Sequence, residues 1–327
     1  MGYWLKRILN IMSLGILCKR YSIYYCCVCK KLVSKTHTSR DKFKDHIIVS
    51  FGWKKDKYDP RDLLYKHIYF FKGSIPEKVD LRQYAEKVGD QGNEGSCTGW
   101  AGRYLKGWYE KKQKDYPDNG LSARCIYNGA KAIGGYLNEE GAYPRDIMQF
   151  LKDYGTCTEE RWPYIPNSET NVDPRTKIPL SDMSEWQIER YVRLETINEV
   201  LEALASGIPV YLGVLWHSNW ILVGPNGKLP KGNGKIVGGH AILALGYDLK
   251  ERRILFENSW SQLWGQMGYG WVLMDDLIEQ EKDMDMWIVT DKEPINPPSP
   301  PEPSKYCKFL KQIDKMVHDE MNRVGCK

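Results

Sequence analysis

Four residues have the types that nucleophilic cysteine catalysis needs. Cys97 follows a Gly-Ser pair and opens an apolar pattern at helical spacing. We therefore expect it at a helix N-terminus, where the helix dipole favours a thiolate. His240 precedes an apolar strand pattern and can act as the base. Asn258 can fix the imidazole tautomer, and Gln91 can donate to an oxyanion beside the backbone N–H of Cys97.

Each of these residues also has an ordinary structural explanation. A lone cysteine is usually packed in a core, and a lone histidine before a strand is usually a structural one. An asparagine beside a tryptophan is usually part of a turn. Only the spacings taken together favour chemistry, and the glycines before His240 leave room for a substrate backbone.

Around these four positions the sequence resembles the papain-like cysteine peptidases. The stretch from Gln91 to Cys97, "QGNEGSC", matches the family pattern Q-G-x-x-G-S-C. His240 begins "HAILALGY", which has the apolar run and G-Y ending of the family's histidine segment. Asn258 begins "NSWSQLWGQMGY", which follows the family's asparagine motif except at Ser261. The resemblance covers about residues 50 to 290.

The resemblance implies roles for residues beyond these four. The stretch "EGAYP" is similar to the family's G-G-Y-P segment, whose backbone pairs with an extended substrate in relatives. Gly141 and Ala142 are therefore expected to bind substrate, and so is Gly239. The implied reaction is attack of a Cys97 thiolate, paired with a His240 imidazolium, on a peptide carbonyl.

The stretch "GSCTGWA", with "DPRDLLY" and "VDLR" upstream, resembles the bacterial and viral-type branch of the family most, and the chain departs from the papain pattern at several points. Glu94 stands where the papain signature C-G-[SA]-C-[WY] has its first cysteine, which removes a disulfide seen in secreted members. Thr98 replaces the aromatic residue after the nucleophile. Residues 1–80 show no helical prosegment of the kind found in secreted members, although non-helical residues of this region could still block the cleft.

The elements needed to position these residues follow from local patterns. Helices are expected from Cys97 to about Lys112, after Ser122, from Pro144, and after a capping box formed by Thr196 and Glu199. Beyond residue 207, short apolar stretches broken by Gly, Asn and Asp indicate strands. The prediction is an α+β, two-lobed papain-like fold: a helical lobe that carries the cysteine helix, an antiparallel β-barrel-like lobe, and a cleft between them.

Composition divides the 327 residues into four parts. Residues 1–45 form a basic, cysteine-containing arm, and residues 46–290 form the peptidase domain. Residues 291–304 are a proline-rich linker, and residues 305–327 form an amphipathic helix. Because the excess positive charge lies in the arm rather than on a folded face, no nucleic-acid partner is expected. Nine cysteines are an odd number and argue against a dense disulfide framework.

The expected partner is a peptide or protein substrate, with no metal and no organic cofactor. An apolar run over residues 8–17 is too short to span a bilayer, so the arm is expected to associate weakly with membranes or to act as a signal-like segment. A cytoplasmic or membrane-associated location is favoured over secretion. The C-terminal helix either docks on its own domain, self-associates or binds a partner.

Two other functions stay open from the sequence. A cysteine-dependent amidase or acyl transferase could act on a non-protein amide such as a cell-wall peptide, because the motif specifies attack on an acyl carbon and not the acyl group. A catalytically inactive scaffold could use the same cleft to hold peptides. Endopeptidase and exopeptidase activities are not distinguished.

Overall fold

A computed structural model describes residues 23–26, 31–34, 50–68, 73–113, 116–117 and 119–291. In the predicted basic arm it describes only strands β1 (Ile23–Cys26) and β2 (Lys31–Ser34), which pair antiparallel. The predicted linker, beyond its first residue, and the predicted C-terminal helix lie outside the described residues. Within the described ranges, no helix has the length and apolarity to cross a membrane.

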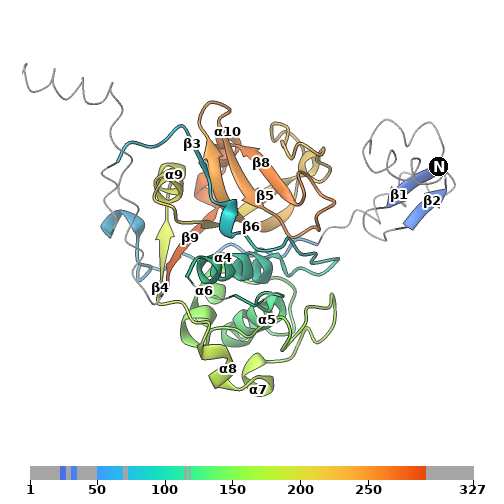
Figure 1. The fold of residues 1–327 in the computed structure, drawn as a ribbon, viewed down its shortest axis with the longest axis vertical. Helices are drawn as coiled ribbons and strands as arrows, with labels where there is room; N and C mark the ends of the chain where they lie inside the picture. The colour runs from blue at the N-terminus through green and yellow to red at the C-terminus, as the bar shows by residue number, and fades with distance from the viewer. Residues whose placement is uncertain are drawn as a thin grey trace, which may run out of the picture.

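The helices predicted from local patterns are present. Three of them, α4 (Cys97–Gln113), α5 (Ala123–Gly134) and α6 (Pro144–Asp153), pack together on one side of the molecule (Figure 1). The Ser122 hydroxyl caps α5 by accepting from the backbone N–H of Cys125, and Pro144 occupies the first turn of α6. Two short helices, α7 (Pro174–Lys177) and α8 (Leu180–Ser184), follow at the far end.

Two glycines of α4 explain how closely its neighbours approach. A Cβ atom on Gly99 would lie 2.6 Å from the Cβ of Tyr127 in α5, and one on Gly102 would lie 2.7 Å from Cγ2 of Ile147 in α6. Both distances are shorter than ordinary van der Waals contact. The two glycines lower the helix propensity of α4. Because they have no side chain, α5 and α6 can pack closely against the N-terminal part of α4 and hold it in place.

A single seven-stranded antiparallel sheet forms the other side. Its order is β4 (Arg190–Leu194), β9 (Asp285–Thr290), β5 (Val210–His217), β6 (Ile236–Asp248), β7 (Arg253–Glu257), β8 (Tyr269–Leu273), and β3 (Lys78–Asp80) also pairs with β6. Helix α9 (Ile197–Ala205) begins with the predicted capping box, and α10 (Met274–Glu279) follows β8.

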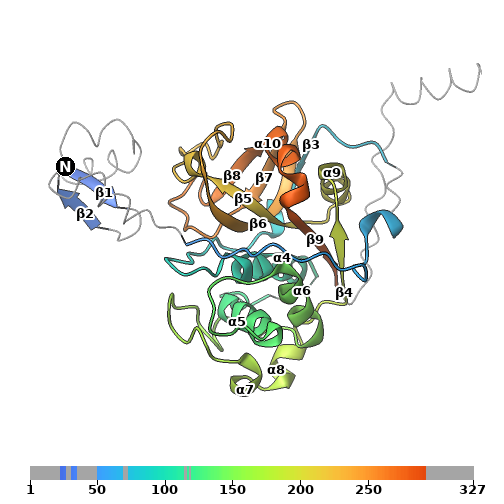
Figure 2. The same cartoon turned by 180° about the vertical axis from the view of Figure 1, so that it is seen from behind.

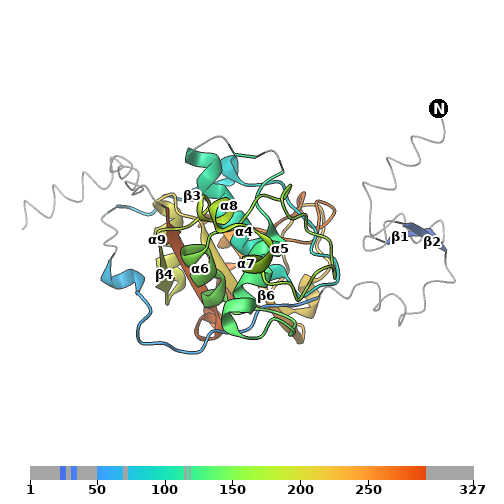
Figure 3. The same cartoon turned by 90° about the horizontal axis from the view of Figure 1, so that it is seen from below.

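The sheet corrects one prediction, because it is open rather than barrel-like. Among the described strands, β4 pairs only with β9 and β8 only with β7, so the two ends of the sheet do not meet. Closure needs a strand tilt and a register shift that bring the edge strands together. Here β4, which local sequence patterns did not predict, extends the sheet on the side away from β8 and lies beside α6 (Figure 3).

The helices and the sheet meet along α4. This helix packs against β5 and β6, and two of its side chains bond across the boundary. The indole of Trp108 donates to the Leu81 carbonyl at 2.8 Å, and the hydroxyl of Tyr109 donates to the Val289 carbonyl at 2.8 Å. Figure 2 shows α4 directly beside β6, and the backbone N–H of Ala241 in β6 lies close to the sulfur of Cys97, the first residue of α4.

Candidate active site

Cys97 is the first residue of α4 and is fully buried. The backbone N–H groups of Ala241, Gly52, Thr98 and Trp53 lie close enough to its sulfur to favour the thiolate. Burial outweighs them and raises the pKa of the Cys97 thiol to about 11. In this conformation the thiol is therefore neutral at neutral pH.

His240 lies on β6, one residue before Ala241, and is also fully buried. Its Nε2 atom donates to Oδ1 of Asn258 at 2.8 Å, which fixes the tautomer. Its Nδ1 atom has no partner among the described residues. Burial lowers the pKa of the His240 imidazole to about 4, although the hydrogen bond that His240 donates to Asn258 has the opposite effect.

Aromatic rings enclose the His240 imidazole. The Trp260 ring lies with its centroid 4.6 Å from that of the imidazole, and the Trp216 ring centroid is 4.9 Å away at a steep angle. The Phe51 ring meets the imidazole edge-on, with 6.1 Å between the two ring centroids. These rings exclude water from the His240–Asn258 hydrogen bond, so little solvent competes for it.

Gln91 is held in one orientation by three hydrogen bonds of its side chain. Its Oε1 atom accepts from the hydroxyl of Ser259 at 2.6 Å, and its Nε2 atom donates to the carbonyls of Glu94 and Ser50 at 2.8 and 2.9 Å. The role of Ser259 was not predicted. Its position directly after Asn258 in the asparagine motif is the signal that could have indicated it.

Residues 50–56, which we call the covering segment, lie across this site (Figure 2). The N–H of Ala142 donates to the Gly52 carbonyl at 2.8 Å, and the Ala142 carbonyl accepts from the N–H of Lys54 at 3.0 Å. The N–H of Trp53 donates to the Gly239 carbonyl at 3.1 Å. The backbone predicted to bind substrate is thus paired with the chain's own N-terminal residues.

Gly141 contributes through its backbone shape. Its φ of 78° is in the left-handed region that favours glycine, and a Cβ atom there would lie 2.6 Å from the Gly52 carbonyl oxygen. Its N–H donates to the hydroxyl of Tyr127 at 2.8 Å. Glycine at this position therefore lets an extended chain approach Ala142 closely.

Glu94, which stands where the papain signature has its first cysteine, forms a buried ion pair with Arg124. The Glu94 carboxylate accepts from both terminal nitrogens of Arg124, with Nη2 at 2.6 Å, and from the backbone N–H of Asn167 at 2.7 Å. Glu94 and Arg124 are both almost completely buried. The loop that leads into Cys97 is therefore anchored to α5 by charge rather than by a covalent bond.

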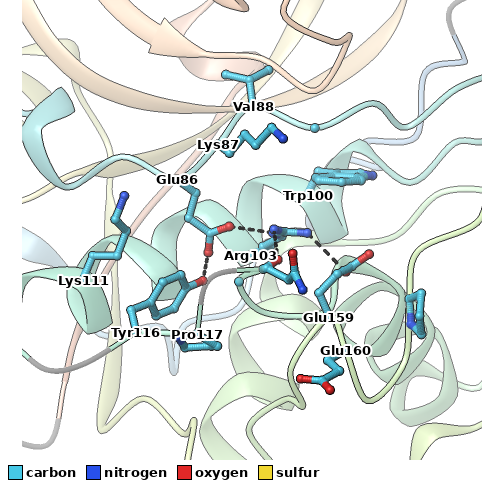
Figure 4. A pocket seen from close by; sticks show the side chains of 14 residues that line it. Glu86, Lys87, Val88, Trp100, Arg103, Lys111, Tyr116, Pro117, Glu159 and Glu160 are labelled. Atoms are coloured by element: carbon cyan, nitrogen blue, oxygen red, sulfur yellow. Dashed lines mark hydrogen bonds and ion pairs between the residues drawn. The ribbon is translucent and has the colours of Figure 1, made fainter.

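The described residues also form a separate cavity of about 720 Å³ that is lined in part by Trp100, Arg103 and Lys111 of α4 (Figure 4). Arg103 crosses it, with Nε 2.6 Å from Glu86 and Nη1 3.2 Å from Glu159, so its charge is already balanced. Burial raises the pKa of Glu86 to about 7. None of the four predicted catalytic residues lines this cavity, and their own site is filled by the covering segment.

The site combines a buried cysteine at a helix N-terminus with a histidine on the neighbouring strand, and an asparagine orients that histidine. This is the arrangement of a cysteine-dependent hydrolase.

Comparison with known proteins agrees with this class of enzyme. Residues 75–287 match the family model described as papain family cysteine protease. The chain is 29% identical over 275 residues to an uncharacterized peptidase C1-like protein of Acanthamoeba polyphaga mimivirus, covering 74% of this chain and 87% of that protein.

Papain from Carica papaya is 26% identical over 261 residues, covering 71% of this chain and 64% of papain. Among solved structures, xylellain, a cysteine protease from Xylella fastidiosa, superposes with a TM-score of 0.65 at 28% identity, covering 75% of this chain and 97% of xylellain. The chain belongs to the papain family of cysteine proteases, and its α+β fold is papain-like. It is a peptidase, and both a viral and a bacterial protein are among its relatives.

Proposed function

We propose that the chain hydrolyses peptide bonds with Cys97 as nucleophile, His240 as acid and base, Asn258 as the group that orients His240, and Gln91 as an oxyanion donor. Asn258 occupies Nε2 of His240, so only Nδ1 is left to exchange a proton with the thiol. The side-chain N–H of Gln91 that now bonds the Ser50 carbonyl would bond the substrate oxyanion.

In the proposed reaction, the Cys97 proton passes to His240 and the sulfur attacks the peptide carbonyl carbon. The oxyanion accepts hydrogen bonds from Gln91 and from the Cys97 N–H. His240 then gives its proton to the leaving amine, which leaves a thioester. Water, deprotonated by His240, hydrolyses the thioester and restores the thiol.

The observation that carries this proposal is that the site already holds a peptide. The covering segment is bound by backbone hydrogen bonds from Ala142 and to Gly239, which is how a sheet edge binds an extended peptide irrespective of its sequence. A peptide carbonyl also lies at the Gln91 donor. These contacts favour a peptide substrate over a non-protein amide.

The same contacts make the described conformation a latent one. The covering segment fills the substrate backbone site and buries both Cys97 and His240, and burial is the largest cause of both pKa shifts. We propose that peptide hydrolysis requires this segment to leave. Solvent access would then allow the thiolate and imidazolium to form as a pair.

The first prediction tests the nucleophile in the full chain. We expect Cys97→Ala to abolish both hydrolysis of fluorogenic peptides and labelling by a peptidyl vinyl sulfone, because the thiolate is the attacking group. Cys125→Ala is the matched control, since Cys125 is another buried free cysteine, and it should keep both activities. Peptide hydrolysis by Cys97→Ala at the rate of the unmodified chain would refute the mechanism.

A further inference from the structure

The side chain of Trp53 fills a pocket in the sheet beside the active site. Trp53 is only 8% exposed, and its backbone N–H bonds the Gly239 carbonyl. A Cβ atom on Gly213 would lie 2.2 Å from the indole Nε1, and one on Gly239 would lie 2.4 Å from Cε3 of the same ring. The pocket can therefore hold a ring of this size only because both positions are glycine. We call the space bounded by Gly213, Gly239 and Asp285 the indole pocket.

Asp285 provides the polar group of the indole pocket. It lies on β9 directly opposite Gly213 of β5 and is fully buried. Its Oδ2 atom accepts from the Trp53 indole at 2.8 Å and from the Asp56 N–H at 2.8 Å. Its Oδ1 atom accepts from Nη2 of Arg193 at 2.7 Å.

If the covering segment left, the Oδ2 atom of Asp285 would lose its hydrogen-bond donors while Oδ1 kept its donor. Both donors to Oδ2 belong to that segment, whereas the Arg193 bond to Oδ1 belongs to the sheet. A buried carboxylate oxygen without a donor is costly, and a ligand that supplies an N–H recovers that cost. A ligand of the same size without a donor does not, so the pocket can discriminate between the two.

We propose that Asp285 is a specificity-determining residue and that the indole pocket selects substrate peptides with a large planar side chain that carries an N–H donor, tryptophan above all. This inference rests on the proposed function, because it assigns to substrate the backbone site that the covering segment now occupies. Arg193 already balances the charge of Asp285, so the pocket should bind a side chain with a neutral N–H donor better than the guanidinium of a substrate arginine.

The test uses the full chain carrying Trp53→Ala, which empties the pocket without truncation. We expect this variant to label with the vinyl sulfone faster than the unmodified chain, because the covering segment has lost its largest anchor. A positional library of fluorogenic peptides should then show one substrate position at which tryptophan exceeds phenylalanine in kcat/KM by roughly ten- to a hundredfold. Arginine at that position should be cleaved less well than tryptophan.

Two second-site variants link this preference to the pocket. Asp285→Asn keeps the shape and can still accept from Arg193, but it presents an amide N–H toward the indole, so the tryptophan-to-phenylalanine ratio should fall to about one. Asp275→Asn, an exposed residue paired with Arg252, is the matched control and should leave the ratio unchanged. Circular dichroism of each variant verifies folding.

Gly213→Ala tests the size of the pocket. The added methyl group lies within 2.2 Å of the place of the indole nitrogen, so cleavage of peptides with tryptophan at the selected position should be lost while valine there is still accepted. Gly224→Ala is the control, because a Cβ atom there has its nearest neighbour at 3.7 Å, an ordinary contact. It should leave the preference intact.

Several results would overturn the inference while leaving the proposed function standing. They are equal cleavage of tryptophan and phenylalanine substrates, a preference for arginine over tryptophan, a ratio unaffected by Asp285→Asn, and labelling of Trp53→Ala no faster than that of the unmodified chain. Failure of the proposed function looks different: Cys97 would be labelled, but no peptide in the library would be cleaved.

Discussion

At the scale of single residues, burial determines the protonation of the Cys97–His240 pair. The thiol pKa is raised to about 11 and the imidazole pKa is lowered to about 4. A raised thiol pKa keeps the sulfur protonated below it, and a lowered imidazole pKa keeps the ring neutral above it. Between these values both groups are uncharged, so the ion pair expected from the sequence belongs to the uncovered site and not to the described conformation.

Ser259 gives a residue-scale prediction about the oxyanion donor. Its hydroxyl bonds Oε1 of Gln91, so Ser259→Ala should free the amide to rotate and lower kcat by roughly tenfold with little change in KM, a smaller loss than removing an oxyanion donor outright. The amide acts only on the developing oxyanion, which is why kcat carries the effect. Ser181→Ala, at an exposed position on α8, should have no effect. An unchanged kcat in Ser259→Ala would show that Gln91 is oriented by other contacts.

At the scale of secondary-structure elements, the predictions that succeeded rest on local signals. The cap at Ser122, the proline at the start of α6 and the Thr196–Glu199 capping box each act within a few residues of the chain, so the sequence reveals them directly. The apolar runs of β5 to β9 are equally local. The four residues singled out by their motif spacings lie together near β6 and the start of α4, and their catalytic roles are the proposal made above.

The elements that escaped prediction depend on distant partners. β4 carries arginines at two of its five positions and is a strand because it pairs with β9, almost a hundred positions later. The covering segment has no periodic pattern, and its bonds reach Ala142 and Gly239. Blocking of the cleft by non-helical residues of this region was an expectation from the sequence. The pairing of Trp53 with Asp285 could not be predicted, because no local sequence signal joins two residues so far apart in the chain.

The ion pair between the cysteine loop and α5 gives an element-scale prediction. Glu94→Gln should lower the free energy of unfolding by about 3 kcal/mol, because it leaves the Arg124 guanidinium buried without a counter-charge. Urea denaturation monitored by tryptophan fluorescence measures this change. The matched control is Glu195→Gln, which breaks a half-exposed pair with Lys66 and should cost less than about 1 kcal/mol. Equal losses in the two variants would contradict the anchoring role of Glu94.

At the scale of the whole molecule, the covering segment joins the two sides that form the site. Its backbone pairs with Ala142 just before α6 and with Gly239 on β6, so it bridges the helices and the sheet (Figure 2). Asp56 ends the segment and is buried, accepting from the backbone N–H of Arg145 at 3.1 Å and from the Trp287 indole at 3.0 Å. Opening the site therefore means withdrawing a carboxyl group from a charged, buried cluster.

That cluster makes opening dependent on pH. Burial and the neighbouring Asp285 carboxylate raise the pKa of Asp56 to about 8, although Arg145 and Arg193 oppose the shift. Asp62 also faces these two arginines, at 2.6 Å from Arg145 and 3.7 Å from Arg193. A released Asp56 returns to a pKa near its usual value of about 4. Between about pH 4 and pH 8, docking of the segment therefore takes up a proton on Asp56. The segment binds most tightly near pH 4 and more weakly as the pH rises toward 8.

We accordingly expect the rate of Cys97 labelling in the unmodified chain to rise between pH 5 and 8 more steeply than in Asp56→Asn. The asparagine is neutral at every pH, so its docking cannot depend on a proton at this position. The thiol itself titrates in both chains, and the ratio of the two labelling rates cancels that contribution. A ratio that stays flat or falls over this range would mean that Asp56 does not govern release of the covering segment.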